Sequence, residues 1–166
     1  MSTTDMNAGR ATELPGPDVL EMRVEVVVVP VSDVDRSRRF YEQLGWRFDT
    51  ELMSDDGVRL IQFTPPGSLA SVSFGTGITS AEPGSAESVV LAVHDVEASR
   101  AALVERGIEV SEVFHDAGGV FHHAGTAGRV PGPHPERRTY ASWPSFDDPD
   151  GNGFLLQEIT SRPPGR

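Results

Sequence analysis

The sequence predicts an α+β fold built from two βαβββ modules, and three observations lead to this prediction. First, a segment that begins at Val26 is repeated in a segment that begins at Ser88. Second, each copy opens with a valine-rich run and continues with residues that are typical of a helix start. Third, short apolar runs separated by turn residues follow each copy. A chain of 166 residues is also long enough to form one domain with a substantial core.

The repeat extends over 21 positions without a gap. VVVVPVSDVDRSRRFYEQLGW starts at Val26, and SVVLAVHDVEASRAALVERGI starts 62 residues later. Valines alone could match by chance because strands favour them, but the ordered series Asp, Ser-Arg, Gly could not easily do so. The repeat therefore indicates two related modules. The eight identical pairs are Val27/Val89, Val28/Val90, Val31/Val93, Asp33/Asp95, Val34/Val96, Ser37/Ser99, Arg38/Arg100 and Gly45/Gly107.

A helix is predicted directly after each valine run. Asp33 and Asp95 are suitable N-caps, because a carboxylate accepts hydrogen bonds from the first free N–H groups of a helix. Gly45 and Gly107 stand where a glycine would end each helix. The runs GVRLIQF and LASVSF predict further strands in the first module, and EVSEVF, TYASW and FLLQEI do so in the second.

The globular part is expected to cover residues 21–160, with modules at about 21–80 and 85–160. Residues 1–20 are expected to be a disordered tail, because they are polar and lack the apolar stretch of a signal peptide. Residues 161–166 form a second, shorter tail.

The second module contains an insertion. PPGSLASVSF, from Pro65, aligns with PDGNGFLLQE, from Pro149, at a shift of 84 residues. Because the modules begin with a shift of only 62, the second module contains 22 additional residues before this point. These residues fall in a loop at about 115–138. The loop is rich in histidine, and it contains His115, His122, His123 and His134.

Composition argues against several classes of function. The net charge of −11 disfavours binding to nucleic acid and to acidic membranes. The absence of cysteine excludes disulfides, thiolate metal sites and a cysteine nucleophile. No apolar run approaches the ~20 residues of a membrane helix. A cytoplasmic protein with a small-molecule partner is therefore expected.

The segment DPDGNGFLLQEI, which starts at Asp148, begins like a calcium-binding EF-hand loop. Asp148, Asp150 and Asn152 match the first, third and fifth ligand positions, but the twelfth position requires a glutamate and holds Ile159. Pro149 and the Asp-Gly and Asn-Gly pairs are typical of a β-turn. We therefore expect a turn that leads into a strand.

Paired modules of this kind, with V-x-D-x-x-x-S-x-x-F-Y in the first helix and D-P-D-G-N before the last strand, resemble the vicinal oxygen chelate superfamily. This superfamily includes glyoxalase I, extradiol dioxygenases and bleomycin resistance proteins. The resemblance implies a glyoxalase-like fold, in which cupped mixed sheets enclose a pocket, and a homodimer. The residues that carry it are Val31, Asp33, Ser37, Phe40, Tyr41, Gly45, Val93, Asp95, Gly107, Phe146 and Asp148 to Asn152.

The resemblance also implies four positions for metal ligands, two in each module. In this sequence they are Val26, Ser71, Ser88 and Leu155, with Ser71 placed through the repeat alignment. None is His, Glu or Gln, and valine and leucine offer no donor to a divalent cation. We therefore expect no metal at the usual site and no cofactor.

The expected pocket is mainly apolar, since alternate side chains of a strand share one face. Such a pocket suits an uncharged or aromatic organic molecule. At most one of Tyr140 and Trp143 is expected to face the ligand, because they are an odd number of residues apart. The predicted ligand-binding residues are Val26, Val28, Ser71, Ser88, Val90, Tyr140, Trp143, Leu155 and Gln157.

Two functions stay open, and we favour the first. The chain is either a binding protein, like the antibiotic-resistance members of the family, or an enzyme such as a lyase, isomerase or dioxygenase. The enzyme would be metal-independent with a loop histidine as acid or base, or it would use a non-standard metal site. The catalytic candidates are His115, His122 and His123, because imidazole exchanges protons near neutral pH. The alternative to a catalytic or metal-binding role is a plain Gly/Pro-rich loop, whose histidines are solvated or hydrogen-bonded.

Three arginines of the same region are candidates for an anionic group. Arg129, Arg137 and Arg138 could bind such a group, although ion pairs with surface acids are the favoured interpretation.

Overall fold

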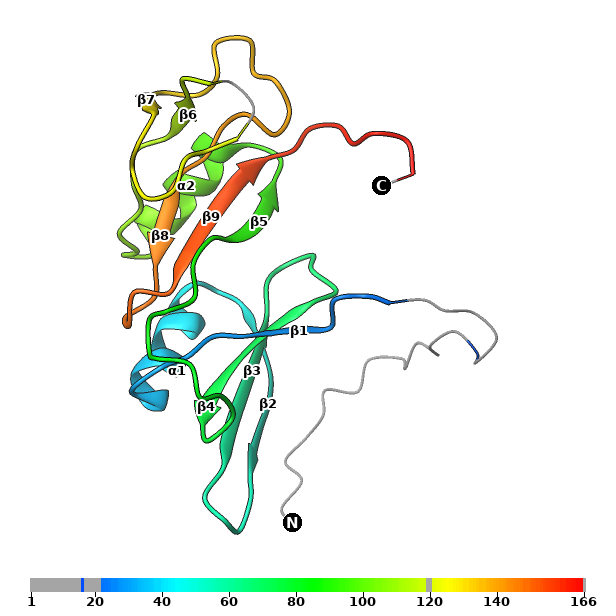
Figure 1. Ribbon diagram of the computed structural model, residues 1–166, viewed down its shortest axis with the longest axis vertical. Coiled ribbons are helices and arrows are strands. Elements are labelled where there is room, and N and C mark those ends of the chain that lie inside the picture. Colours follow the sequence, from blue (N-terminus) through cyan, green and yellow to red (C-terminus); the bar gives the residue numbers. More distant parts are fainter. Residues whose placement is uncertain (1–15, 17–21, 119–120, 166) are drawn as a thin grey trace. The chain divides into compact units, whose positions relative to one another are not determined.

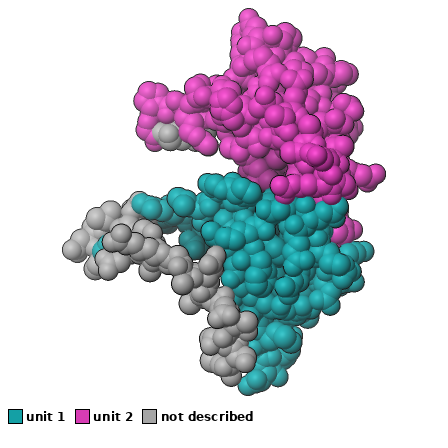
Figure 2. All heavy atoms as spheres, turned by 180° about the vertical axis from the view of Figure 1, so that it is seen from behind, with its two compact units in different colours: residues 1–83 teal, residues 84–166 magenta. Residues whose placement is uncertain are grey.

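The computed structural model describes residues 16, 22–118 and 121–165. The chain divides into two compact units, Met1–Pro83 and Gly84–Arg166, which Figure 2 colours separately. Figure 1 labels the helices and strands. The tail expected at residues 1–20 lies outside the described residues except for Gly16.

Unit 1 has the predicted βαβββ order within its described residues. The sheet order is β1-β4-β3-β2, in which β1 runs parallel to β4 and the other neighbours are antiparallel. Strand β2 was not among the runs predicted from the sequence. The elements are β1 (Val26–Val28), α1 (Val34–Gln43), β2 (Arg47–Met53), β3 (Arg59–Thr64) and β4 (Ser71–Thr76).

The predicted helix ends are confirmed in both units. Asp33 and Asp95 each accept a hydrogen bond of 2.9 Å from the backbone N–H three residues further on. Gly45 and Gly107 follow the helices with φ angles of +77° and +80°, a conformation that glycine adopts without strain. The repeated Asp and Gly residues thus fix the start and the end of each helix.

The core of unit 1 lies between α1 and one face of the sheet. The Tyr41 ring stacks on Phe74 with centroids 4.9 Å apart and lies 5.3 Å from Trp46. Tyr41 and Phe74 are completely buried. Val26 and Val28, on the edge strand β1, are each 41% exposed. Within unit 1 the two valines therefore remain partly open.

Unit 2 begins with the same strand and helix but then departs from the plain module. Its main sheet has the order β5-β9-β8, and a separate pair, β6-β7, forms a hairpin inside the histidine-rich loop. The mixture of helices and sheets confirms the predicted α+β class. The elements are β5 (Val89–Val93), α2 (Val96–Glu105), β6 (Phe114–Asp116), β7 (Arg129–Pro131), β8 (Ser145–Asp147) and β9 (Gly153–Glu158).

The predictions of regular strands in EVSEVF and TYASW were wrong. Ser111 donates its backbone N–H to Ser145 O (2.8 Å), whereas Phe114 and Trp143 exchange backbone bonds of 2.8 and 2.9 Å. The three residue steps from Ser111 to Phe114 therefore lie opposite the two steps from Ser145 to Trp143. One extra residue on one strand is the geometry of a β-bulge. The bulge interrupts regular pairing, although the two segments still run side by side.

The sheet of unit 2 carries aromatic residues on both faces. Phe146 and Phe154 stack in parallel on one face, with centroids 5.1 Å apart. On the other face Phe114, Trp143 and Leu155 form a buried cluster. Neither helix of the described chain has the length and apolar character that crossing a bilayer requires.

Candidate functional site

A cavity of about 330 Å³ lies in unit 2. Residues from the segment before β5, from the histidine-rich loop and from the β8–β9 hairpin line it. They include Ser88, His122, Arg129, Ser145, Asp147 and Leu155. Two of the residues predicted to bind a ligand, Ser88 and Leu155, therefore line one cavity together with a predicted catalytic candidate, His122.

Strand register explains which side chains share the cavity face of the sheet. Ser145 pairs with Leu155 and Asp147 pairs with Gly153 across β8 and β9. Because alternate residues of a strand share a face, Ser145, Asp147 and Leu155 lie on one side. This is the side opposite to Phe146.

A column of stacked groups forms beside the cavity. The Arg129 guanidinium lies 4.0 Å over the Phe114 ring, the Phe114 ring stacks on Trp143 at 6.0 Å, and His122 meets Trp143 edge to face at 5.7 Å. Trp143 is only 1% exposed. Direct stacking of a ligand on Trp143, as the sequence suggests, would therefore require His122 to move aside.

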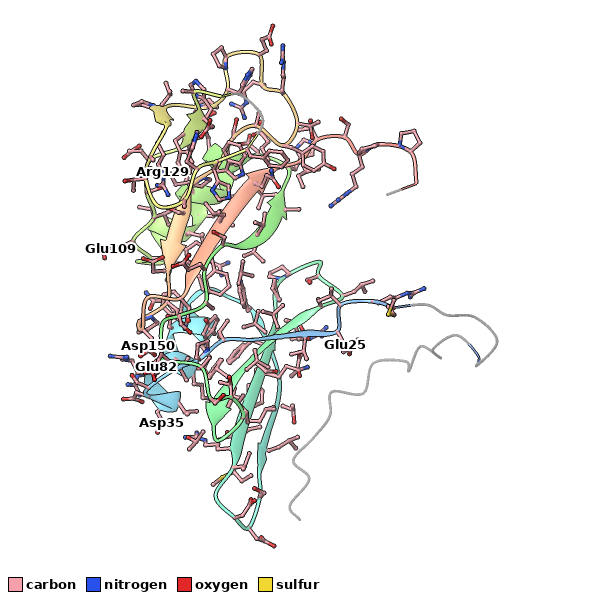
Figure 3. The ribbon with its side chains drawn as sticks, in the orientation of Figure 1. Glu25, Asp35, Glu82, Glu109, Arg129 and Asp150 are labelled. Carbon is pink, nitrogen blue, oxygen red and sulfur yellow. The ribbon has the colours of Figure 1, made fainter. Side chains whose placement is uncertain are left out.

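Arg129, labelled in Figure 3, is a partly desolvated cation at this cavity. It donates to Ser145 Oγ (3.2 Å) and to Gly125 O (3.1 Å), and it forms no ion pair with the described residues. Burial lowers the pKa of Arg129, and the negative charge of Asp147 opposes this effect. The surface ion pair favoured from the sequence is therefore not formed at Arg129.

Asp147 is the complementary charge on β8. Burial, and then the neighbouring charge of Asp148, raise the pKa of Asp147, while Arg129 acts in the opposite direction. The cavity thus contains a positive and a negative side chain that affect each other but do not close into a contact ion pair.

Asp116 and His123 form a second arrangement of chemical interest in the loop. His123 Nδ1 lies 2.6 Å from Asp116 Oδ2, and the Asp116 side chain is 2% exposed. Hydrogen bonds from the Gly118 backbone and then from His123 lower the pKa of Asp116. An ionised carboxylate accepts only, so Nδ1 of His123 carries a proton and donates it to Asp116. In the neutral imidazole Nε2 is then left as a proton acceptor.

The other histidines have different surroundings. His115 Nδ1 lies 2.8 Å from Gly132 O, and its ring is 5.8 Å from that of His134. His122 covers Trp143. Within the described residues, His123 alone of the three catalytic candidates has a buried carboxylate as its partner. The described residues contain no group of three or more His, Asp or Glu side chains that could hold a metal ion.

The four positions at which the family resemblance implies metal ligands lie on β1, β4 and β9 and directly before β5. Val26 pairs with Ser71, but Leu155 pairs with Val90, the repeat counterpart of Val28, and Val28 itself pairs with Ser73. By register, the counterpart of Leu155 is therefore Ser73, two residues beyond the Ser71 of the repeat alignment.

The serines of β4 belong to a hydrogen-bond network that the sequence did not reveal. Ser71 Oγ lies 2.7 Å from Thr64 Oγ1, and Thr64 and Gln62 both donate to the carboxylate of Asp49. Burial raises the pKa of Asp49, but hydrogen bonds from Thr64, Arg47 and Gln62 outweigh it, so that the pKa is lowered overall. The sequence did not predict a role for Asp49 because its strand, β2, was not predicted.

Three further predicted ligand-binding residues do not line the cavity. Gln157 donates its side-chain amide to Tyr140 O (2.9 Å), and Tyr140 has a φ angle of +69°. Val90, on the edge strand β5, is 47% exposed. Within unit 2, Ser88 and Leu155 thus line the cavity, whereas Val90, Tyr140 and Gln157 do not.

The calcium-like segment forms the predicted turn. Asp148 Oδ1 accepts the backbone N–H groups of Asp150 and Asn152, each at 2.9 Å, and Oδ2 accepts Asn152 Nδ2 at 2.7 Å. Asn152 Oδ1 in turn accepts the backbone N–H of Ala86 at 3.1 Å. The acids and amide therefore hold the hairpin and tie it to the segment that enters β5.

Solved structures similar to this chain include TnmS3, an antibiotic binding protein from Streptomyces sp. CB03234. The two are 27% identical with a TM-score of 0.61, and the match covers 84% of this chain and 97% of that one. A glyoxalase/bleomycin resistance protein from the same organism is also 27% identical, with a TM-score of 0.59, and the match covers 81% of this chain and 99% of that one.

A further superfamily member, from Sphaerobacter thermophilus, is 23% identical with a TM-score of 0.59, covers 84% of this chain and 98% of that one, and supports the fold alone. No curated protein matches the chain significantly in sequence. The model of the Glyoxalase/Bleomycin resistance protein/Dioxygenase superfamily matches residues 23–156. The resemblance seen in the sequence and the glyoxalase-like fold are therefore confirmed, and the chain belongs to the glyoxalase/bleomycin resistance protein/dioxygenase superfamily.

Proposed function

We propose that this chain is a binding protein that sequesters a small, mostly apolar or aromatic organic molecule without a metal. The cavity of unit 2 carries the proposal, because Leu155 and His122, which lies at the end of the stacked column, are among the residues that line it. Aromatic and apolar walls with a few polar groups are typical of small-molecule sites. The similarity to an antibiotic binding protein supports a resistance or sequestration role.

Donor chemistry also favours metal-free binding. Val26 and Leu155 occupy two of the positions at which the family resemblance implies metal ligands, and neither side chain can coordinate a cation. The hydroxyl groups of Ser88 and of Ser71, or of Ser73 by strand register, complete the set. Both β4 serines are bonded within their own sheet, Ser71 to Thr64 and Ser73 to Gln62. The proposal includes a homodimer in the cytoplasm, as family resemblance and composition favour.

Tryptophan fluorescence tests the proposal. In the Trp46→Phe variant, Trp143 is the sole reporter, and saturable quenching by a subset of aromatic natural products is expected, since His122 and Leu155 lie between the cavity and the Trp143 ring. Quenching of Trp143 that does not saturate would contradict binding in this cavity.

Elemental analysis of protein purified without a histidine tag tests the metal-free part. One equivalent of tightly bound zinc, iron, manganese or nickel would overturn it.

A second candidate function rests on the Asp116–His123 pair. A buried carboxylate that orients an imidazole is a common arrangement for general acid–base catalysis, and His123 remains 60% exposed. In this alternative His123 Nε2 takes a proton from a bound substrate, and no metal is needed. Turnover of a bound compound that is lost in His123→Ala but kept in His115→Ala, with binding retained in both, would support catalysis. Compounds that bind without any conversion would leave sequestration as the function.

A further inference from the structure

Arg129 is held in place with part of its donor capacity unused. A guanidinium has five N–H groups, and only two hydrogen bonds, to Ser145 Oγ and Gly125 O, join it to the described residues. Its face rests on Phe114 at 4.0 Å. Both partners that accept its bonds are neutral, so the positive charge at the cavity is not neutralised by contact.

Asp147 presents the opposite charge at a defined spacing. Ser145 and Asp147 are two residues apart on the same face of β8, which corresponds to about 6.5 Å along a strand. Because Arg129 contacts Ser145, its guanidinium lies beside the side chain that directly neighbours Asp147 on this face of β8. The Asp147 carboxylate accepts no hydrogen bond from the described residues, and its pKa is raised, chiefly by burial.

Other charged groups of the cavity favour a cation at the Asp147 end. Glu87 also lines the cavity, and the adjacent Ser88 lies against Gly153, the strand partner of Asp147. Asp148 adds a further negative charge to the surroundings of Asp147. Glu87 and Asp147 at one end of the cavity and Arg129 at the other would bind neither a plain anion nor a plain cation as well as a group that carries both charges.

We propose that this cavity recognises the zwitterionic aminocarboxylate group of an aromatic, amino-acid-like compound, with the carboxylate on Arg129 and the ammonium on Asp147. The inference rests on the proposed binding function and names the chemical class of its ligand. The aromatic part of the compound would lie against His122 and Leu155. Charge-assisted hydrogen bonds are about twice as strong as neutral ones, so two of them would dominate selectivity.

Four phenylalanine derivatives provide matched probes with one aromatic body. L-phenylalanine carries both charges, L-phenylalaninamide only the ammonium, N-acetyl-L-phenylalanine only the carboxylate, and N-acetyl-L-phenylalaninamide neither. The full chain is titrated with each compound by NMR at about pH 6, where the amino groups are protonated and the carboxyl groups ionised. We expect L-phenylalanine to bind at least about tenfold more tightly than any of the others, a ratio that corresponds to about 1.4 kcal/mol.

Two substitutions assign the charges. Arg129→Met should remove the advantage of the carboxylate, so that L-phenylalanine binds no better than L-phenylalaninamide. Asp147→Asn should remove the advantage of the ammonium, so that L-phenylalanine binds no better than N-acetyl-L-phenylalanine. Arg129→Lys keeps the charge and should keep most of the preference, which separates loss of charge from loss of the Phe114 stack.

The failure of this inference differs from the failure of the proposed function. If all four compounds bind equally well at His122 and Leu155, zwitterion recognition is overturned while aromatic binding stands. If none of them shifts the resonances of cavity residues, the zwitterion proposal is likewise overturned, and the fluorescence experiment with other aromatic compounds decides the proposed function.

Discussion

Glu158 binds Arg137 through two hydrogen bonds of 2.6 and 3.0 Å, and the same carboxylate accepts the backbone N–H of Val96 at 3.2 Å. The Glu158 side chain is 2% exposed. Hydrogen bonds from Arg137 to Glu158 first, and then to Glu97, raise the pKa of Arg137 above its usual value. One buried carboxylate thus joins the end of β9, the first residue of α2 and the loop before β8.

Replacement of Arg137 by methionine should destabilise unit 2. Breaking a fully buried pair costs about 3–5 kcal/mol, and because Arg137 is 41% exposed we expect about 2 kcal/mol. Chemical denaturation measures this change. The control is Arg138→Met, whose pair with Glu136 is exposed on both sides and should contribute less than about 0.5 kcal/mol. Equal losses for the two variants would argue against the role of the buried carboxylate.

Replacement of Asp148 by alanine should destabilise the β8–β9 hairpin, because Asp148 accepts three hydrogen bonds within the turn. Hydrogen bonds to a charged group contribute about 1.5–3 kcal/mol each, and partial compensation by water leads us to expect a loss of about 2–4 kcal/mol. Asp55→Ala, in the exposed turn between β2 and β3, should have little effect on the unfolding midpoint. Calcium should not raise the melting temperature of the unchanged protein, and a calcium-dependent rise would contradict the turn assignment.

Replacement of Gly128 by alanine should separate His123 from Asp116. A Cβ at this position would lie 2.5 Å from His123 Nδ1 and 3.1 Å from Asp116 Oδ2. Gly125→Ala is a matched control, since its φ of +64° is close to the +69° of Gly128 but its Cβ would meet no atom within 4 Å. Nitrogen chemical shifts of the His123 imidazole report the tautomer. We expect the Nδ1–H form to be lost in the Gly128 variant alone, and its survival there would refute the steric argument.

The stability of the protein should depend on the ionisation of Asp147. Its folded-state pKa is raised, so its contribution to stability is greatest at low pH and is lost as pH rises through that pKa. Asp147→Asn, which cannot ionise, should therefore be more stable than the unchanged protein at neutral pH. The difference between the two melting temperatures should shrink as the pH is lowered towards 4, roughly the ordinary pKa of aspartate. A difference that grows with acidification would mean that the carboxylate is favoured in its charged form.

The repeat made the first module predictable, because local signals agree with the final structure. Asp33 and Gly45 act at the ends of α1 as their positions in the sequence indicate. Prediction from the sequence fails where long-range contacts override the local pattern of apolar and polar residues. Strand β2 contains charged residues and a register shift at Asp49, so its alternation is obscured.

The candidate site was harder to predict than the fold. Strand alternation predicts Trp143 and Leu155 as site residues, but the groups that cover them are Phe114, directly before the insertion, and His122 within it. The sequence offers Arg129 as a candidate for binding an anion, yet none of its neighbours along the chain indicates that it stacks on Phe114. The insertion has no counterpart in the first module. The repeat alignment therefore gives no information about the contacts that the insertion makes around the cavity.

The strand registers of the two units have a consequence for homology arguments in this family. Ser71 and Ser73 differ by one full pleat, so a slip of two residues leaves each of them on the same side of β4. A comparison of the two halves can therefore misplace a residue by about 7 Å and still describe the chemistry of that sheet face correctly. A slip of one residue would instead have exchanged the serine face for the face that carries Val72 and Phe74, an error that hydrophobicity alone would have exposed.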